Sequence, residues 1–212
     1  MCGINGVVSF TSEQDDCRAM VERMNLALAH RGPDDEGVFA VEGLALGQRR
    51  LSIIDLSDAG HQPMHSADGR FVLVFNGEIY NFRELRAQLD YPFRSHSDSE
   101  VLLAAWQVWG THCIERLVGM FAFAIWDRQS SELHLVRDRV GIKPLYYYLD
   151  ADRIVFSSEV RSVLASQAVN GKLNPRGLID YLRYQCVHQP DTIVEGIKML
   201  PAASHMRVRR GQ

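Results

Sequence analysis

Several strand-like runs in this 212-residue chain are apolar on both faces, and this feature limits the folds that the chain can adopt. Residues 71–75 and 120–126 are the clearest examples, because nearly every side chain in them is apolar. A strand of this kind has to be covered on both sides. Helical patterns occur before, between and after the strand-like runs, which are mostly joined by short turns. The pattern predicts an α+β domain in which helices cover stacked antiparallel sheets.

Short-range patterns predict the individual elements. Strands are expected at residues 4–10, 37–41, 44–48, 71–75, 120–126, 132–137, 145–149, 153–156 and 206–209. Helices are expected at residues 17–28, 81–89, 101–109, 111–118, 158–165 and 175–184. The stretches 12–15 and 97–100 resemble capping boxes, and Asn81 and Asn174 are expected as N-caps. The Asn76-Gly77 pair is expected to interrupt the strand that begins at residue 71.

Composition limits the classes of partner. A net charge of −3 without a long basic run argues against nucleic acid or an anionic membrane as the main partner. The first residues form neither a secretory signal nor a membrane anchor. The four cysteines show no CxxC pair, which favours reduced thiols in the cytoplasm, and the histidines have no metal-ligand spacing. Without a repeat or a linker, residues 1–212 are expected to form a single domain.

Cys2 is the first candidate for chemistry. Its small side chain favours removal of Met1, which would leave a thiol and an α-amine on one residue, a nucleophile with its own base. A free α-amine titrates near pH 8, so part of it is unprotonated at neutral pH. The strand expected at residues 4–10 would anchor this nucleophile. On position alone, an accidental cysteine beside the start codon is the favoured interpretation.

Other residues can supply the companions that an acyl-transfer thiol needs. The side chain of Asn76 and the backbone N–H of Gly77 can hold an oxyanion, although Asn-Gly is also a hairpin signal. Arg50 can clamp a carboxylate, although most arginines form surface ion pairs. Asp98 can bind an ammonium group or stabilise a helix N-terminus. Glu78 can also bind an ammonium group, or it can lie on the exposed face of a strand. Each signal is weak alone.

Seven motifs in a fixed order make these signals specific. They are Cys2-Gly3-Ile4, His30-Arg31-Gly32-Pro33-Asp34, Arg50-Leu51-Ser52-Ile53-Ile54-Asp55, Phe75-Asn76-Gly77-Glu78-Ile79-Tyr80-Asn81, Ser97-Asp98-Ser99-Glu100, Gly119-Met120-Phe121-Ala122-Phe123 and Arg137-Asp138-Arg139-Val140-Gly141-Ile142-Lys143-Pro144-Leu145-Tyr146. Together they resemble the N-terminal glutaminase domain of the glutamine-hydrolysing asparagine synthetases, a class II glutamine amidotransferase of the Ntn-hydrolase type. The resemblance covers essentially the whole chain.

The resemblance implies a four-layer α/β/β/α sandwich and a role for each candidate residue. Cys2, freed from Met1, would attack the glutamine side-chain amide, and its α-amine would act as the base. The oxyanion would be held by Asn76 and Gly77. The glutamine α-carboxylate would bind Arg50, and its α-ammonium would bind Glu78 and Asp98. The resemblance suggests structural loop roles, rather than catalytic ones, for Arg31, Arg137 and Asp138.

The resemblance also implies a partner. In the synthetases an ATP-dependent domain with a phosphate-binding loop follows, and no such loop occurs here. We therefore expect ammonia to pass to a synthetase domain in cis or in trans, with ATP and Mg²⁺ used there and no cofactor or metal needed in this domain. The acceptor of the ammonia and a homodimeric state are left open. The alternatives are an Ntn amidase with another substrate, the amidotransferase half of a non-asparagine pathway enzyme, and a binding module without activity that retains Met1.

Overall fold

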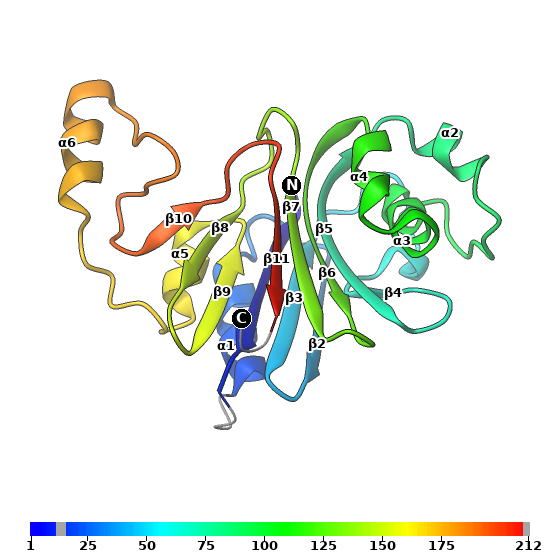
Figure 1. Cartoon of the computed structure of the whole chain (residues 1–212), viewed down its shortest axis with the longest axis horizontal. Helices are drawn as coiled ribbons and strands as arrows, with labels where there is room; N and C mark the ends of the chain where they lie inside the picture. Colours follow the sequence, from blue (N-terminus) through cyan, green and yellow to red (C-terminus); the bar gives the residue numbers. More distant parts are fainter. Residues whose placement is uncertain (12–15, 210–212) are drawn as a thin grey trace.

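Two antiparallel β-sheets lie face to face between layers of helices in the computed structural model, which describes residues 1–11 and 16–209 (Figure 1). The six-stranded sheet has the order β10-β8-β9-β1-β3-β2. Its strands are β1 (Gly3–Ser9), β2 (Asp35–Val41), β3 (Leu44–Arg50), β8 (Tyr146–Leu149), β9 (Arg153–Ser157) and β10 (Ile197–Met199). In this sheet β1 pairs with both β3 and β9, so the N-terminal strand is central and its first residues are firmly held.

The second sheet contains five strands in the order β11-β7-β6-β5-β4. They are β4 (Met64–His65), β5 (Phe71–Ile79), β6 (Gly119–Asp127), β7 (Glu132–Arg137) and β11 (His205–Arg209). The register between β5 and β6 is continuous from Phe71 opposite Asp127 to Ile79 opposite Gly119. This long pairing fixes the orientation of every residue of β5, including the candidate pair Asn76-Gly77.

Three apolar clusters join the layers. The inner faces of the two sheets meet in a core that contains Val72, Val74, Ile4 and Phe156. The outer face of the six-stranded sheet packs against α1 (Cys17–Ala27) and α5 (Val160–Ala165). The outer face of the five-stranded sheet packs against α3 (Asp98–Trp109), with α2 (Phe82–Arg86), α4 (Cys113–Arg116) and the 3₁₀ turn η2 (Gly110–His112) beside it. The predicted α+β, four-layer sandwich is therefore confirmed.

Helix α6 (Pro175–Tyr184) lies at the edge of the molecule, away from the stacked sheets (Figure 1). Asn174 caps it as predicted, because its side-chain oxygen accepts the backbone N–H of Arg176. Within this helix Gly177 is the buried residue, whereas Leu182 and Tyr184 are exposed. None of the helices in residues 1–11 and 16–209 is both long enough and apolar enough to cross a membrane.

The structure corrects several local predictions. Asn76-Gly77 does not interrupt its strand, because pairing with β6 carries β5 through to Ile79. Asn81 precedes a helix that ends at Arg86 rather than at residue 89, and its side chain bonds to Arg116 O and Val118 N instead of capping that helix. The helix predicted at 111–118 is split into η2 and α4. The segment between β3 and β4 contains a further 3₁₀ turn, η1 (Asp58–Gly60).

The two predicted capping boxes have different outcomes. Ser97 caps α3, because its hydroxyl accepts the backbone N–H of Glu100. In a capping box the Glu100 carboxylate would in turn accept the backbone N–H of Ser97. Here it accepts the backbone N–H groups of Arg94 and Ser95 instead. The capping box predicted at Ser12 to Asp15 lies outside the described residues. Helix α1 is capped by the Asp16 side chain, which accepts the backbone N–H of Ala19.

A histidine pair, of which His134 is buried and His205 is exposed, joins β7 to the last strand, β11. His134 Nδ1 and His205 Nε2 are 2.8 Å apart, and the ring of Trp106 packs against His134 with 5.0 Å between the ring centroids. Burial, together with the charge of His205, lowers the pKa of His134 from its usual 6.5 to about 4. Burial also lowers the pKa of His205. The folded chain therefore holds His134 neutral at pH values where the unfolded chain protonates it.

This difference predicts that the free energy of unfolding falls as the pH falls from about 6.5 to about 4, by at most about 3 kcal/mol from His134. The change can be followed by urea unfolding with Trp106 fluorescence as the signal. His134→Gln should reduce the slope in this pH window, and the surface variant His112→Gln is the matched control. An unchanged slope in His134→Gln would contradict the assignment.

Candidate active site

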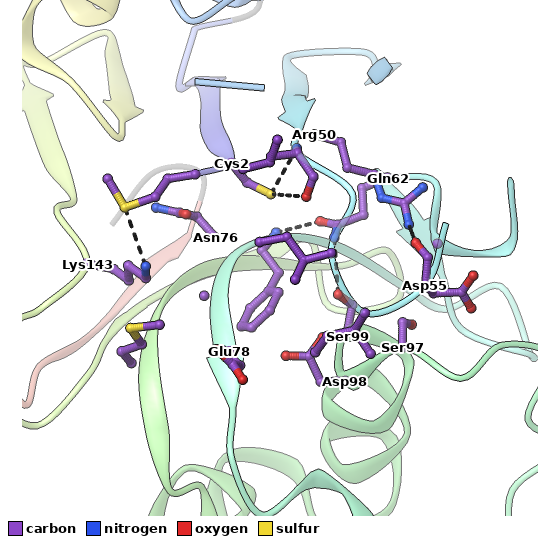
Figure 2. Close-up of a pocket in the computed structure, with 18 residues that line it drawn as sticks. Cys2, Arg50, Asp55, Gln62, Asn76, Glu78, Ser97, Asp98, Ser99 and Lys143 are labelled. Carbon is purple, nitrogen blue, oxygen red and sulfur yellow. Dashed lines mark hydrogen bonds between the residues drawn. The ribbon is translucent and has the colours of Figure 1, made fainter. Parts of the chain in front are cut away.

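All six candidate residues line one pocket of about 100 Å³ (Figure 2). The residues are Cys2, Arg50, Asn76, Gly77, Glu78 and Asp98. They come from the N-terminus, the end of β3, the second half of β5 and the first turn of α3. Residues that are far apart in the sequence are therefore brought together by the packing of the two sheets and α3.

Cys2 lies immediately before β1 and is held through both its backbone and its thiol. The backbone N–H of Leu51 donates to Cys2 Sγ at 3.4 Å, and Sγ lies 3.6 Å from Leu51 O, to which it can donate. Arg31 Nε donates to Cys2 O at 2.8 Å, while Arg31 Nη1 donates to Glu159 at 3.0 Å. The Arg31–Glu159 pair thus fixes the carbonyl of Cys2.

The Cys2 thiol is kept in its protonated form. Burial raises the pKa of this thiol, and the negative charge of Asp98 adds to that rise. The hydrogen bond from Leu51 and the positive charges of the N-terminus and Arg50 oppose it without reversing the direction. Because the thiolate is the nucleophilic form, a base has to take the thiol proton before attack.

The sheet pairing aims the Gly77 N–H away from β6. Gly77 lies opposite Phe121, whose N–H donates to Asp138 Oδ2 and whose carbonyl accepts the Asp138 N–H. Both backbone groups of Phe121 thus point away from β5, which makes Gly77 and Phe121 a non-hydrogen-bonded pair of the antiparallel ladder. A Cβ on residue 77 would also lie 2.4 Å from Met120 O, so the close pairing with β6 requires glycine.

The N–H groups of Phe75 and Ile79 share this edge of β5, because alternate residues present their backbone groups to the same side. The Phe75 N–H donates to Gln62 Oε1 at 2.7 Å, and the Ile79 N–H donates to Asp98 Oδ2 at 2.9 Å. The Gly77 N–H lies between these two bonded groups, on the edge that faces the pocket. It is therefore a backbone donor available to a ligand.

Asn76 supplies a second donor. Its side chain follows those of Val72 and Val74 on alternate residues, so it faces the six-stranded sheet and Cys2 (Figure 2). The residue is 1% exposed, and Asn76 Nδ2 has no hydrogen-bond partner among the described residues. A buried polar group without a partner costs free energy unless a ligand satisfies it. Asn76 Nδ2 and the Gly77 N–H thus form a suitable pair for an oxyanion.

The Arg50 guanidinium is held by the loop that follows β3. Nη1 donates to Ser57 O at 3.1 Å, and Nη2 donates to Asp55 O. A Cβ on residue 60 would lie 2.0 Å from Arg50 Nη2, so Gly60 leaves the space that the guanidinium fills. These contacts hold a buried positive charge at one end of the pocket, where it can attract a carboxylate.

Two carboxylates lie at the junction of β5 and α3. Asp98 is buried, and burial raises its pKa to about 6, with a smaller contribution from the charge of Glu78. Glu78 is exposed on β5. An ammonium group at this place would relieve the cost of burying the Asp98 charge, so the junction suits a cationic group. Asp98 also begins α3 and bonds to Ile79, so its structural role is real as well.

Gln62 and Lys143 are further buried residues of the pocket that were not predicted as site residues. Gln62 joins β5 to α3, because its Nε2 donates to Ser99 Oγ at 3.2 Å while its oxygen accepts from Phe75. Lys143 reaches the N-terminus from the loop after β7. Lys143 belongs to the longest of the seven motifs, which was the available signal, whereas no local pattern marks Gln62. No group of three or more His, Cys, Asp or Glu side chains in the described ranges is placed to hold a metal ion.

Comparison with known proteins identifies relatives of the whole chain. A family model described as a glutamine amidotransferase domain matches residues 1–212. Asparagine synthetase [glutamine-hydrolyzing] 1 of Bacillus subtilis is 38% identical over 217 residues, which cover 99% of this chain and 34% of that protein. A putative asparagine synthetase [glutamine-hydrolyzing] 2 of Methanocaldococcus jannaschii is 38% identical over 192 residues, covering 82% of this chain and 37% of the relative.

The fold has relatives among solved structures. The glutamine phosphoribosylpyrophosphate amidotransferase of B. subtilis superposes with a TM-score of 0.68 at 18% identity, covering 99% of this chain and 49% of that one. The present chain spans about a third of the length of the curated relatives that it matches. Since the family model covers every residue, the chain belongs to the glutamine amidotransferase family.

Proposed function

We propose that this domain hydrolyses the side-chain amide of glutamine to glutamate and ammonia through a thioester on Cys2. The α-amine of Cys2, exposed by removal of Met1, takes the thiol proton, directly or through a water molecule. The sulfur attacks the amide carbon, and the carbonyl oxygen becomes an oxyanion held by Asn76 Nδ2 and the Gly77 N–H. The C–N bond then breaks as the protonated α-amine of Cys2 gives this proton to the leaving nitrogen, which departs as ammonia.

The second half of the reaction regenerates the thiol. The same α-amine takes a proton from water, whose oxygen attacks the γ-glutamyl thioester. The C–S bond breaks, glutamate is released and the proton returns to the sulfur. The two donors at Asn76 and Gly77 serve both tetrahedral intermediates, because the oxyanion forms on the same oxygen each time.

The charges of the pocket fit the backbone end of glutamine. We assign the α-carboxylate to Arg50 and the α-ammonium to Asp98 and Glu78, which lie in the same pocket as Arg50. The observation that carries the proposal is the unpartnered, buried Nδ2 of Asn76 beside the free N–H of Gly77, in one pocket with the Cys2 thiol. An accidental surface cysteine would not face two such donors.

We further propose that the ammonia passes to an ATP-dependent synthetase unit of the asparagine synthetase type, joined to this domain or associated with it. Both curated relatives are named glutamine-hydrolysing asparagine synthetases and extend well beyond the matched region. ATP and Mg²⁺ would be used in that unit, and the glutaminase domain itself needs no cofactor for the steps above. A synthetase unit of a different amidation pathway is the alternative, and assays with the partner unit and candidate acceptors would distinguish the two.

The domain should release ammonia from glutamine, and Cys2→Ala should abolish this release because the nucleophile is lost. Cys186→Ala is the matched control, since Cys186 is an exposed thiol outside the pocket.

Asn76→Ala should lower kcat by about 10²–10³ through loss of one oxyanion donor. Intact-mass measurement should show a chain without Met1 that a glutamine-like electrophile modifies once in the active site. Equal ammonia release by Cys2→Ala would refute the mechanism.

The Asp98 carboxylate predicts a pH dependence. Because burial raises its pKa to about 6, the carboxylate gains a proton as the pH falls through 6 and loses its attraction for the substrate ammonium. The KM for glutamine should therefore increase below pH 6, and Asp98→Asn should have a high KM at every pH. The effect of pH on folding runs in the opposite direction to its effect on substrate binding. Because the pKa of Asp98 is raised in the folded state, the free energy of unfolding decreases as the pH rises through 6. Asp98→Asn should thus raise the free energy of unfolding at pH 8 relative to the parent, and a lower value there would contradict the assignment.

A further inference from the structure

Lys143 carries a buried positive charge that the proposed reaction does not use. The residue is 6% exposed, and its Nζ lies 3.5 Å from Met1 Sδ (Figure 2). No carboxylate in residues 1–11 and 16–209 forms an ion pair with this ammonium. Lysines are rarely buried without a partner, because the charge loses its hydration. The position of this ammonium in the pocket therefore needs a physical reason.

The backbone around Lys143 is fixed, so its side chain is presented to the pocket by a rigid loop. The backbone N–H of Lys143 donates to Asp138 Oδ2 at 3.0 Å, and its backbone carbonyl accepts a hydrogen bond from Arg137 Nε at 2.8 Å. Asp138 also accepts the N–H groups of Val140 and Ile142, and Arg137 also donates to Gly141 O. The charge of Lys143 is thus placed by the fold and does not depend on a flexible surface segment.

Met1 separates this ammonium from Cys2. Its main chain is bonded to Cys2, and its sulfur contacts Lys143 Nζ. When Met1 is removed, the new α-amine belongs to Cys2 and the side chain that covered Lys143 is gone. The ammonium of Lys143 and the α-amine of Cys2 then face the same vacated space.

We propose that the Lys143 ammonium keeps the α-amine of processed Cys2 unprotonated, and thereby available as the base. The inference rests on the proposed function, in which this amine is the base. A like charge nearby disfavours a second ammonium, because the two positive charges repel each other. Lys143 is therefore a positioning residue that acts through the amine and does not touch the substrate.

The other charged groups around Cys2 do not replace Lys143. The Arg31 guanidinium faces the Cys2 carbonyl and is neutralised by Glu159. Arg50 is turned towards the loop carbonyls of Asp55 and Ser57. On the opposite side, Asp98 and Glu78 are negative and would favour a protonated amine. The Cys2 thiol is itself neutral because burial raises its pKa. In the described structure Arg50 and Lys143 form no ion pair, and of these two cations Lys143 is the one whose charged atom contacts Met1, the residue that covers the position of the future amine.

The test compares Lys143→Met, which removes the charge at similar volume, with Lys143→Arg, which keeps it. Above pH 6, where Asp98 is ionised, the acidic limb of the kcat/KM profile for glutamine hydrolysis reports the amine. A free α-amine titrates at roughly 7.7–8.0, and we expect Lys143 to lower this limb by on the order of one pH unit. Lys143→Met should therefore lose about fivefold in kcat/KM at pH 7 and recover at pH 9. Lys143→Arg should retain the parental limb.

A second measurement does not depend on activity. Competitive acetylation of the α-amine at position 2, measured by peptide mass spectrometry over pH 5–10 in the Cys2→Ala background, titrates the same group without the thiol. The pH at the midpoint of the acetylation curve should rise by about one unit in Lys143→Met and stay unchanged in Lys143→Arg. Lys143→Gln is the second neutral variant should Lys143→Met fail to fold.

The outcomes separate the two proposals. A parent chain that does not hydrolyse glutamine refutes the proposed function, while the acetylation curve still decides the role of Lys143. A midpoint that stays unchanged in both neutral variants, or an equal loss of kcat/KM at every pH, overturns the inference and assigns Lys143 a structural or oxyanion role. Retention of Met1 in the purified parent also overturns it, because the amine in question would not exist.

Discussion

The alternation of backbone groups along β5 is the constraint on which the site depends. Pairing with β6 leaves the N–H groups of Phe75, Gly77 and Ile79 on the other edge. Gln62 and Asp98 satisfy the outer two, and the central group remains for a ligand. Leaving a buried donor unsatisfied costs about 1–3 kcal/mol. The register of one sheet thus leaves free the donor that we propose for the oxyanion, and links it to the residue that we assign to the substrate ammonium.

The same site carries charges that oppose folding. Burial raises the pKa values of both the Cys2 thiol and the Asp98 carboxyl, so the charged forms are disfavoured until a partner arrives. Within residues 1–11 and 16–209, Lys143 is buried without a paired anion and Asn76 Nδ2 has no acceptor. Such features persist only when the surrounding structure holds them. Here the long β5–β6 pairing, the capped start of α3 and the Arg137–Asp138 loop contacts provide that support.

Much of the fold was predictable because its signals are local. The strand at Glu132–Arg137 and the helix at Pro175–Tyr184 follow from apolar patterns and from the Asn174-Pro175 start. Asn76-Gly77 was mispredicted because the local turn preference of this pair is overridden by its register with β6. The six candidate residues named from the motifs meet in one pocket, and their roles stay predictions. Gln62 and the contact of Lys143 were not found, because their partners lie 13, 37 and 142 residues away and no period in the sequence marks them.

In the proposed mechanism the nucleophile lies at the chain terminus because the pocket offers no other suitable base. The thiol is protonated, so attack requires a proton acceptor close to Sγ. Among the described residues that line the pocket there is no histidine. In the proposed mechanism the carboxylates of Asp98 and Glu78 hold the substrate ammonium, and Arg50 is a cation. An α-amine on Cys2 meets the requirement without another side chain, provided that it stays unprotonated between Asp98 and Glu78 on one side and Lys143 on the other. We therefore expect the balance of these three charges to set the pH at which the thiol reacts.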